Sequence, residues 1–173
     1  MIYLLIASYL IGSISSAVII CKILGIPDPR TQGSKNPGAT NVLRLGGKKI
    51  AGFVLTFDGL KGATPVIIGH YLELGLTQLT LITLCAFLGH IFPVFFRFRG
   101  GKGVATYLGG LIAINLLAGL IFSVIWLLVA KVLKTSSLAA LIATALSPFY
   151  FYLIIGDLKS TLIIGLISLF IFY

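Results

Sequence analysis

Long apolar stretches separated by short polar segments make up most of the chain. The stretches at 111–129 and 138–155, for example, lack the strict apolar-polar alternation of a membrane-spanning β-strand. Apolar runs of about 20 residues with few charges are typical of transmembrane helices. The pattern predicts an all-α polytopic membrane protein with seven spanning helices, at 2–24, 50–72, 76–96, 104–116, 117–133, 138–155 and 158–173. The fourth is short and could fuse with the fifth, which would leave six spans.

Composition supports a membrane protein of one domain, residues 1–173. The chain is 58% hydrophobic and only 10% charged. Soluble domains are about 45–50% apolar and about 25% charged, so an ordinary water-soluble domain is excluded. Disorder is excluded too, because disordered chains are poor in apolar residues.

The basic residues give the expected orientation. Thirteen Lys and Arg face four acidic residues, a formal net charge of +9. Those in or beside the first, third and fifth connections are Lys22, Arg30, Lys35, Arg44, Lys48, Lys49, Arg97, Arg99, Lys102, Lys131 and Lys134. The positive-inside rule makes this side cytoplasmic, with the N-terminus outside and the C-terminus cytoplasmic. If the fourth and fifth predicted spans were one, the last basic connection would lie on the opposite side of the membrane. The distribution of charge therefore favours seven spans over six. Because the charges border membrane spans, nucleic-acid binding is disfavoured.

Only one predicted connection is long, the cytoplasmic loop at 25–49, and it is rich in glycine, proline and polar residues. A loop of this length inside a compact domain is usually functional. Glycines let backbone amides turn toward an anion, and a guanidinium suits phosphate. The candidate phosphate-binding residues are Gly33, Ser34, Asn36, Gly38, Ala39, Thr40, Asn41 and Arg44. A solvated loop without a ligand is the alternative.

A second glycine-rich segment precedes the fourth predicted span. Its candidate phosphate-binding residues are Gly100, Gly101, Lys102 and Gly103. The start of a helix offers free N–H groups and the positive end of the helix dipole to an anion. Lys102 is followed by Gly103 rather than by Ser or Thr, so this is no nucleotide-binding P-loop and nucleotide hydrolysis is disfavoured. Simple attraction to anionic lipid headgroups is the alternative.

A few polar or reactive residues fall inside predicted spans. Asp58 and Lys61 are three positions apart, so they share one helical face and can neutralise one another. A functional role and a structural pairing are both open for them. The same two alternatives apply to His90, in the cytoplasmic half of its span. Cys21 and Cys85 lack the spacing of a metal site or a redox pair. We therefore expect no metal site and no cofactor.

Three motifs occur in a fixed order along the chain. They are Gly33-Ser34-x-Asn36-Pro37-Gly38-Ala39-Thr40-Asn41-Val42-x-Arg44, Gly89-His90-x-Phe92-Pro93-Val94-Phe95 and Gly100-Gly101-Lys102-Gly103-Val104-Ala105-Thr106. In sequence and order they resemble the bacterial acyl-phosphate-dependent glycerol-3-phosphate acyltransferase family. The resemblance implies a multi-pass inner-membrane enzyme with its active site on the cytoplasmic face. The implied reaction moves a fatty acyl group from acyl-phosphate to the 1-position of glycerol 3-phosphate. It gives lysophosphatidic acid and phosphate, the first acylation of phospholipid synthesis.

The resemblance also implies roles for individual residues. Ser34, Arg44 and Lys102 match the family's substrate-contacting positions. Arg44 and Lys102 would clamp the phosphates, and Ser34 would donate a hydrogen bond rather than act as a nucleophile, since no base partner is visible. The partners implied are the two substrates, membrane lipid and, as a candidate, the peripheral enzyme that makes acyl-phosphate. The family has a further His and Asn in a basic tail, which nothing in this sequence matches, so we expect either a tail beyond Tyr173 or a form that lacks this part of the active site.

Two other functions remain open. A small transporter or exchanger of phosphate compounds would usually show broken helices at mid-membrane, whereas these glycine-rich loops border one face. A non-catalytic lipid-binding scaffold would not depend on the phosphate-binding loops.

Overall fold

The computed structural model describes residues 1–172, which form eight α-helices and one short 3-10 helix. The helices are α1 (Ile2–Gly12), α2 (Ser16–Ile23), α3 (Ala39–Tyr71), α4 (Leu76–Ile91), η1 (Val94–Phe96), α5 (Val104–Ile114), α6 (Leu116–Leu133), α7 (Ser136–Ile155) and α8 (Leu158–Ile171). No strand occurs within residues 1–172. The predicted all-α class is confirmed.

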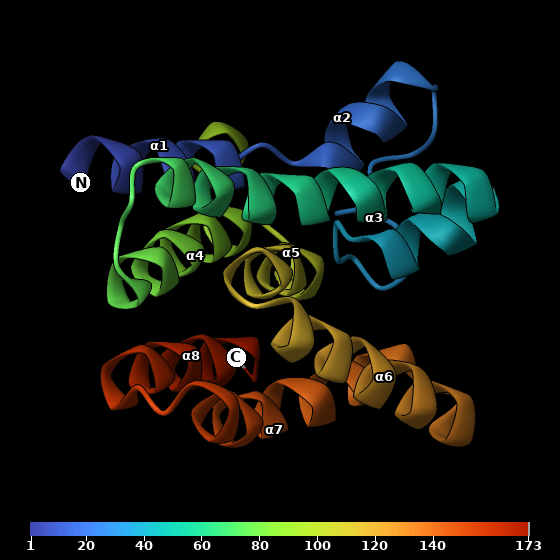
Figure 1. The fold of residues 1–173 in the computed structure, drawn as a ribbon. Helices are drawn as coiled ribbons and strands as arrows, with labels where there is room; N and C mark the ends of the chain where they lie inside the picture. Colours follow the sequence, from blue (N-terminus) through green and yellow to red (C-terminus); the bar gives the residue numbers. More distant parts are fainter. Residues whose placement is uncertain (173) are drawn as a thin grey trace.

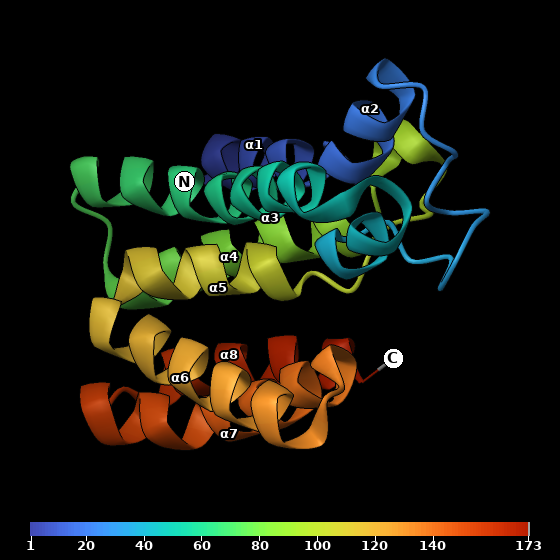
Figure 2. The ribbon, with the colours of Figure 1, turned by 90° about the vertical axis from the view of Figure 1, so that its right-hand side faces the viewer.

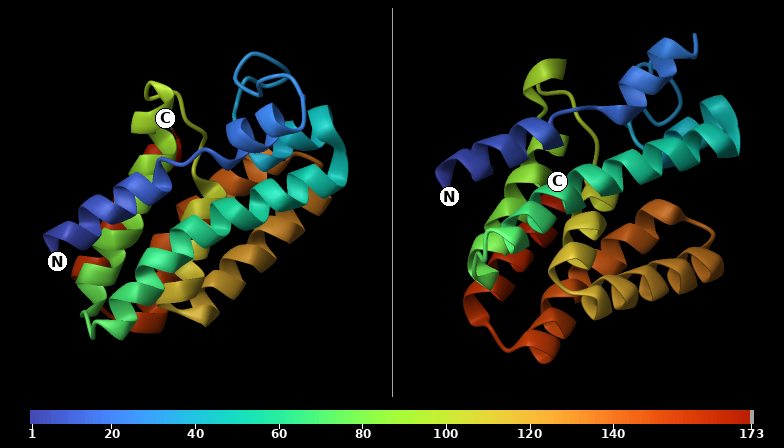
Figure 3. Two further views of the ribbon diagram at one scale, coloured as in Figure 1. Left: turned by 90° about the horizontal axis from the view of Figure 1, so that it is seen from above. Right: turned by 45° about the horizontal axis from the view of Figure 1, so that its top comes forward.

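The helices stack in layers. α1 and α3 lie above α4 and α5, and α6, α7 and α8 lie below them (Figure 1). The connections alternate between two ends of the bundle (Figure 2). One end holds the segment between α2 and α3, the segment between η1 and α5, the α6–α7 turn and the end of α8. Figure 3 shows from two further sides that the first two of these segments project at the same end.

Four helical segments are long and apolar enough to cross a membrane: α3, α4 with η1, α6 and α7. The bent pair α1 and α2 makes a fifth if it forms one span, while α5 and α8 are shorter apolar helices. Large apolar side chains are exposed on every α-helix except α4, for example Phe53, Leu127 and Leu153. Such surfaces fit contact with lipid rather than water, so the protein is a multi-helix membrane protein.

The expectation of one continuous helix at 2–24 is wrong. The chain leaves the helix between Gly12 and Ser16, and α1 and α2 meet at 41°. The carbonyl oxygen of Ile14, freed by the break, accepts a hydrogen bond of 2.8 Å from the Lys61 ammonium group. A broken helix is tolerated inside a membrane protein when neighbouring groups satisfy the freed backbone in this way.

The predicted loop at 25–49 ends too late, because α3 already begins at Ala39. The first turns of α3 are kept in place by Val42, which is fully buried against α2. Gly47 then takes φ +81° and ψ 179°, which kinks α3 before its long spanning part. Glycine adopts a positive φ without steric cost, so the kink falls there.

Other predicted boundaries shift by a few residues. The alternative of a fused fourth and fifth span is wrong, because Asn115 separates α5 from α6. The Asn115 side-chain oxygen caps α6 by accepting a hydrogen bond of 2.9 Å from the Ala118 amide. The span predicted to 96 leaves the α-helix at Ile91, two residues before Pro93. α7 begins at 136 rather than 138, and the predicted end of the last span at Tyr173 lies outside the described residues.

Glycines set the close packing of two helix pairs. A Cβ added to Gly12 would overlap the backbone of α4, and one on Gly62 or Gly109 would overlap the backbone of the facing helix in the α3–α5 pair. Small residues let helices in membranes approach closely. The approach of α3 to α5 brings Asp58 and Lys61 close to the segment that begins α5.

Candidate functional site

The two glycine-rich segments meet at the basic end of the bundle. In Figure 2 both lie beside the start of α3 and the start of α5. A Cβ on Gly101 would lie only 3.2 Å from the carbonyl oxygen of Pro37. The structure therefore brings together segments that are more than sixty positions apart in the sequence.

Asn41 folds the first segment. Its side chain, 1% exposed, donates hydrogen bonds through Nδ2 to the carbonyl oxygens of Pro29 and Gln32, at 2.9 and 3.0 Å. Its Oδ1 accepts from the amide of Ser34 at 3.0 Å. Gly33 has φ +61°, and a Cβ there would overlap Asn41 Oδ1. Asn41 thus holds a turn that leaves the Ser34 side chain exposed to solvent.

The start of α3, which follows this turn, carries further predicted phosphate-binding residues. Gly38 precedes the helix, and the Thr40 hydroxyl lies 3.2 Å from the Ser136 hydroxyl at the start of α7. Arg44 follows one turn after Thr40 and is exposed. The other predicted residues of this segment, which are half-buried, are Asn36 and Ala39.

The second segment folds back on the end of α4. The Gly101 amide donates to the carbonyl oxygen of His90 at 3.2 Å, and a Cβ on Gly100 would overlap the same carbonyl. Gly103 has φ +75° and packs against an aromatic ring of α4. Each glycine is therefore required by a close approach or by its backbone conformation. Lys102, between them, is exposed.

Below this segment lies a buried polar cluster of Ser16, Asp58, Lys61, His90 and Thr106. Asp58 Oδ1 lies 2.9 Å from Lys61 Nζ, accepts from the Ser16 hydroxyl at 2.8 Å and lies 3.7 Å from His90 Nδ1. The Thr106 hydroxyl is 3.2 Å from the same histidine nitrogen. All five side chains are buried, and the ion pair between Asp58 and Lys61 confirms their predicted pairing.

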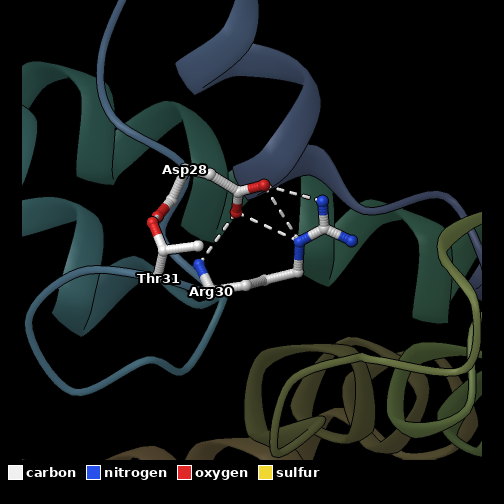
Figure 4. A network of polar contacts seen from close by, with 3 residues as sticks. All are labelled: Asp28, Arg30 and Thr31. Carbon is white, nitrogen blue, oxygen red and sulfur yellow. Dashed lines mark hydrogen bonds and ion pairs between the residues drawn. The ribbon is translucent and has the colours of Figure 1, made fainter.

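An ion pair neutralises one basic residue of this end. Arg30 binds the Asp28 carboxylate with two nitrogens, at 2.6 Å for the shortest contact (Figure 4). The Arg30 guanidinium also lies 5.8 Å from the centre of the Phe96 ring. The hydrogen bonds from Arg30 lower the pKa of Asp28 below its ordinary value. The pair borders a cavity of 640 Å³ that also includes Lys22. None of the predicted phosphate-binding residues lines that cavity.

Sequence reasoning predicted the pairing of Asp58 with Lys61, while substrate binding by Ser34, Arg44 and Lys102 stays a prediction. The side chains of Ser34, Arg44 and Lys102 are all exposed. Sequence reasoning missed Ser16 and Thr106, because small hydroxyl residues in apolar helices usually bond their own backbone. The described part of the chain holds no group of three or more side chains suited to a metal ion.

Comparisons with known proteins agree with the motifs. The family model described as glycerol-3-phosphate acyltransferase matches residues 2–173. A protein of that name from Ruthia magnifica subsp. Calyptogena magnifica is 61% identical over 172 residues, covering 99% of this chain and 87% of the relative. One from Legionella pneumophila, strain Philadelphia 1, is 49% identical over 158 residues; the match covers 91% of this chain and 57% of the relative.

A solved structure agrees as well. The crystal structure of PlsY, an integral membrane glycerol 3-phosphate acyltransferase in its glycerol 3-phosphate form, superimposes with a TM-score of 0.94 at 36% identity. That match covers 99% of this chain and 86% of PlsY. The lysophosphatidic acid form of PlsY gives a TM-score of 0.90 at 35% identity. The chain belongs to the glycerol-3-phosphate acyltransferase family.

Proposed function

We propose that this protein transfers a fatty acyl group from acyl-phosphate to the 1-position of glycerol 3-phosphate, forming lysophosphatidic acid and releasing phosphate. Family membership supports the acceptor and the type of reaction. The observation that carries the proposal is the contact of the two glycine-rich segments through Pro37 and Gly101 at the basic end. Both substrates carry phosphate, and two anion-binding segments on one face match two phosphates.

The proposed chemistry needs no covalent intermediate. The 1-hydroxyl of glycerol 3-phosphate attacks the acyl carbonyl, the bond to the phosphate oxygen breaks, and the hydroxyl proton passes to a phosphate oxygen. Lys102 and Arg44 would bind the phosphates and stabilise the charge that develops on the carbonyl and the departing phosphate. Ser34 would donate a hydrogen bond to a substrate oxygen. Holding two substrates in register supplies much of the remaining rate enhancement.

The membrane arrangement that we propose has seven crossings. α1 and α2 form one bent span, and α5 and α8 cross in turn, because the connections alternate between two ends (Figure 2). The basic end then faces the cytoplasm of a bacterial cell across the inner membrane, with the N-terminus outside. A cytoplasmic peripheral enzyme that makes acyl-phosphate would be its partner, and an acyl chain could reach the site from the bilayer.

A transporter of phosphate compounds is the second candidate. The break between α1 and α2, beside the buried ion pair of Asp58 and Lys61, is the observation that favours it, because transporters often have broken helices. Transport predicts movement of unmodified substrate between compartments. Acyl transfer predicts a new amphiphile in the bilayer.

Sealed vesicles that contain the purified protein separate the two functions. Labelled glycerol 3-phosphate is added outside, with acyl-phosphate in the membrane. We expect the label to appear as lysophosphatidic acid extracted with the lipid, at a rate that depends on acyl-phosphate. Protein-free vesicles are the control. Label that accumulates unchanged in the lumen, with no lipid product, would establish transport instead.

A further inference from the structure

One residue of α4 holds the chain on both sides of Lys102. The carbonyl oxygen of His90 accepts from the Gly101 amide at 3.2 Å, one residue before the lysine. The imidazole Nδ1 lies 3.2 Å from the Thr106 hydroxyl, in the first turn of α5 after the lysine. A Cβ on Gly101 would overlap the imidazole Nε2, so the ring lies directly against the segment.

The ring of His90 is itself supported from below. Its Nδ1 is 3.7 Å from Asp58 Oδ1, and that oxygen is fixed by the Lys61 ammonium at 2.9 Å and the Ser16 hydroxyl at 2.8 Å. Lys61 also bonds the free carbonyl oxygen of Ile14 at 2.8 Å. The cluster therefore links the α1–α2 break, α3, α4 and α5 at one point below Lys102.

A merely packed interior would not need these groups. Asp58 is 2% exposed and Lys61 is 8% exposed. Ionisable groups inside a membrane protein are costly, and apolar residues of similar volume often replace a buried ion pair without loss of stability. A glycine-rich segment, by contrast, has many accessible conformations unless other groups hold it. The cluster supplies such groups where the segment joins α4 and α5.

We propose that His90 and Thr106 are positioning residues for the phosphate-binding segment 100–103, and that the ion pair of Asp58 and Lys61 holds His90 in place. Neither needs to touch substrate; they keep Lys102 and the neighbouring amides oriented toward the phosphate. A binding loop functions only when its supporting side chains fix it to within a fraction of an ångström. The inference rests on the proposed function, whose phosphate-binding segment it concerns.

Thr106 offers the cleanest test, because valine has nearly the same shape and lacks only the hydroxyl. In the purified full chain, binding of labelled glycerol 3-phosphate and of inorganic phosphate is measured, together with kcat, KM and the unfolding temperature. We expect Thr106→Val to weaken phosphate binding and to raise the KM for one of the two phosphate-bearing substrates about tenfold. A change of this size corresponds to the loss of one buried hydrogen bond. The unfolding temperature and kcat should change far less. Thr106→Ser, which keeps the hydroxyl, should restore binding to near wild type.

His90→Ala should weaken phosphate binding at least as much as Thr106→Val. His70→Ala is the matched control, because His70 lies at the far end of α3, is exposed and bonds the Ala113 carbonyl at 2.9 Å. Wild-type phosphate binding by folded Thr106→Val would overturn the inference, and so would a Thr106→Ser variant as weak as Thr106→Val. If the wild type binds phosphate and these variants lose it while no acyl transfer occurs, the inference holds and the proposed function fails.

Discussion

Replacing Lys102 with alanine is expected to lower kcat/KM for acyl transfer by a factor of about 100 to 1000, the usual effect of removing one fixed group that stabilises transition-state charge. Lys102 lies between Gly101 and Gly103. At those two glycine positions the chain is so close to α4 that a side chain would overlap it. Its ammonium is exposed, so its loss should leave the fold intact. The measurement is formation of labelled lysophosphatidic acid by membranes with matched amounts of protein.

Two further variants sharpen this result. Lys131→Ala removes another exposed lysine, near the end of α6 and outside the proposed site, and should keep wild-type activity. Lys102→Arg keeps the charge but changes its shape, so its activity should lie between those of alanine and lysine. A Lys102→Ala enzyme within a few-fold of wild type would remove this lysine from the proposed mechanism.

Asp58→Ala should have the largest effect on stability, lowering the free energy of unfolding by about 3–5 kcal/mol. The change leaves the Lys61 ammonium, 8% exposed, with only the Ile14 carbonyl as a partner. It also leaves the Ser16 hydroxyl without its carboxylate. Denaturant unfolding of the purified protein in detergent measures the difference.

The exposed ion pair supplies the comparison. Asp28→Asn breaks a pair whose side chains are 35% and 27% exposed, and should cost about 0–1 kcal/mol. The double variant Asp58→Asn with Lys61→Met removes both buried charges and should recover part of the loss caused by Asp58→Ala. If Asp58→Ala were no less stable than Asp28→Asn, the buried ion pair would not be what holds the α1–α2 break against α3.

Local patterns in the sequence were enough to predict several parts of the molecule. Uninterrupted apolar runs predict helices, because only a helix satisfies its own backbone in lipid. The spacing of Asp58 and Lys61 predicts their pairing, because residues three apart share a helical face. The glycines around Lys102 predict a phosphate-binding segment; phosphate binding stays a prediction, while the structure shows close contacts at each of these glycines that the sequence did not predict.

Features that depend on distant residues could not be predicted in this way. The α1–α2 break lies within a mostly apolar stretch, and the group that stabilises it, Lys61, lies 47 positions from Ile14. The sequence predicts Asn41 as a phosphate-binding residue. In the structure its side-chain nitrogen Nδ2 instead donates hydrogen bonds to the carbonyl oxygens of Pro29 and Gln32. The meeting of Pro37 with Gly101 depends on how α3, α4 and α5 pack. Such contacts arise only when the helices assemble.

The most direct test of the central claim compares two acyl donors. Purified protein is given labelled glycerol 3-phosphate with either acyl-phosphate or acyl-CoA of the same chain length, and lysophosphatidic acid is quantified. We predict product with acyl-phosphate, with one inorganic phosphate released for each molecule formed, and none with acyl-CoA. Product formed from acyl-CoA, or no product from acyl-phosphate, would contradict the proposed reaction.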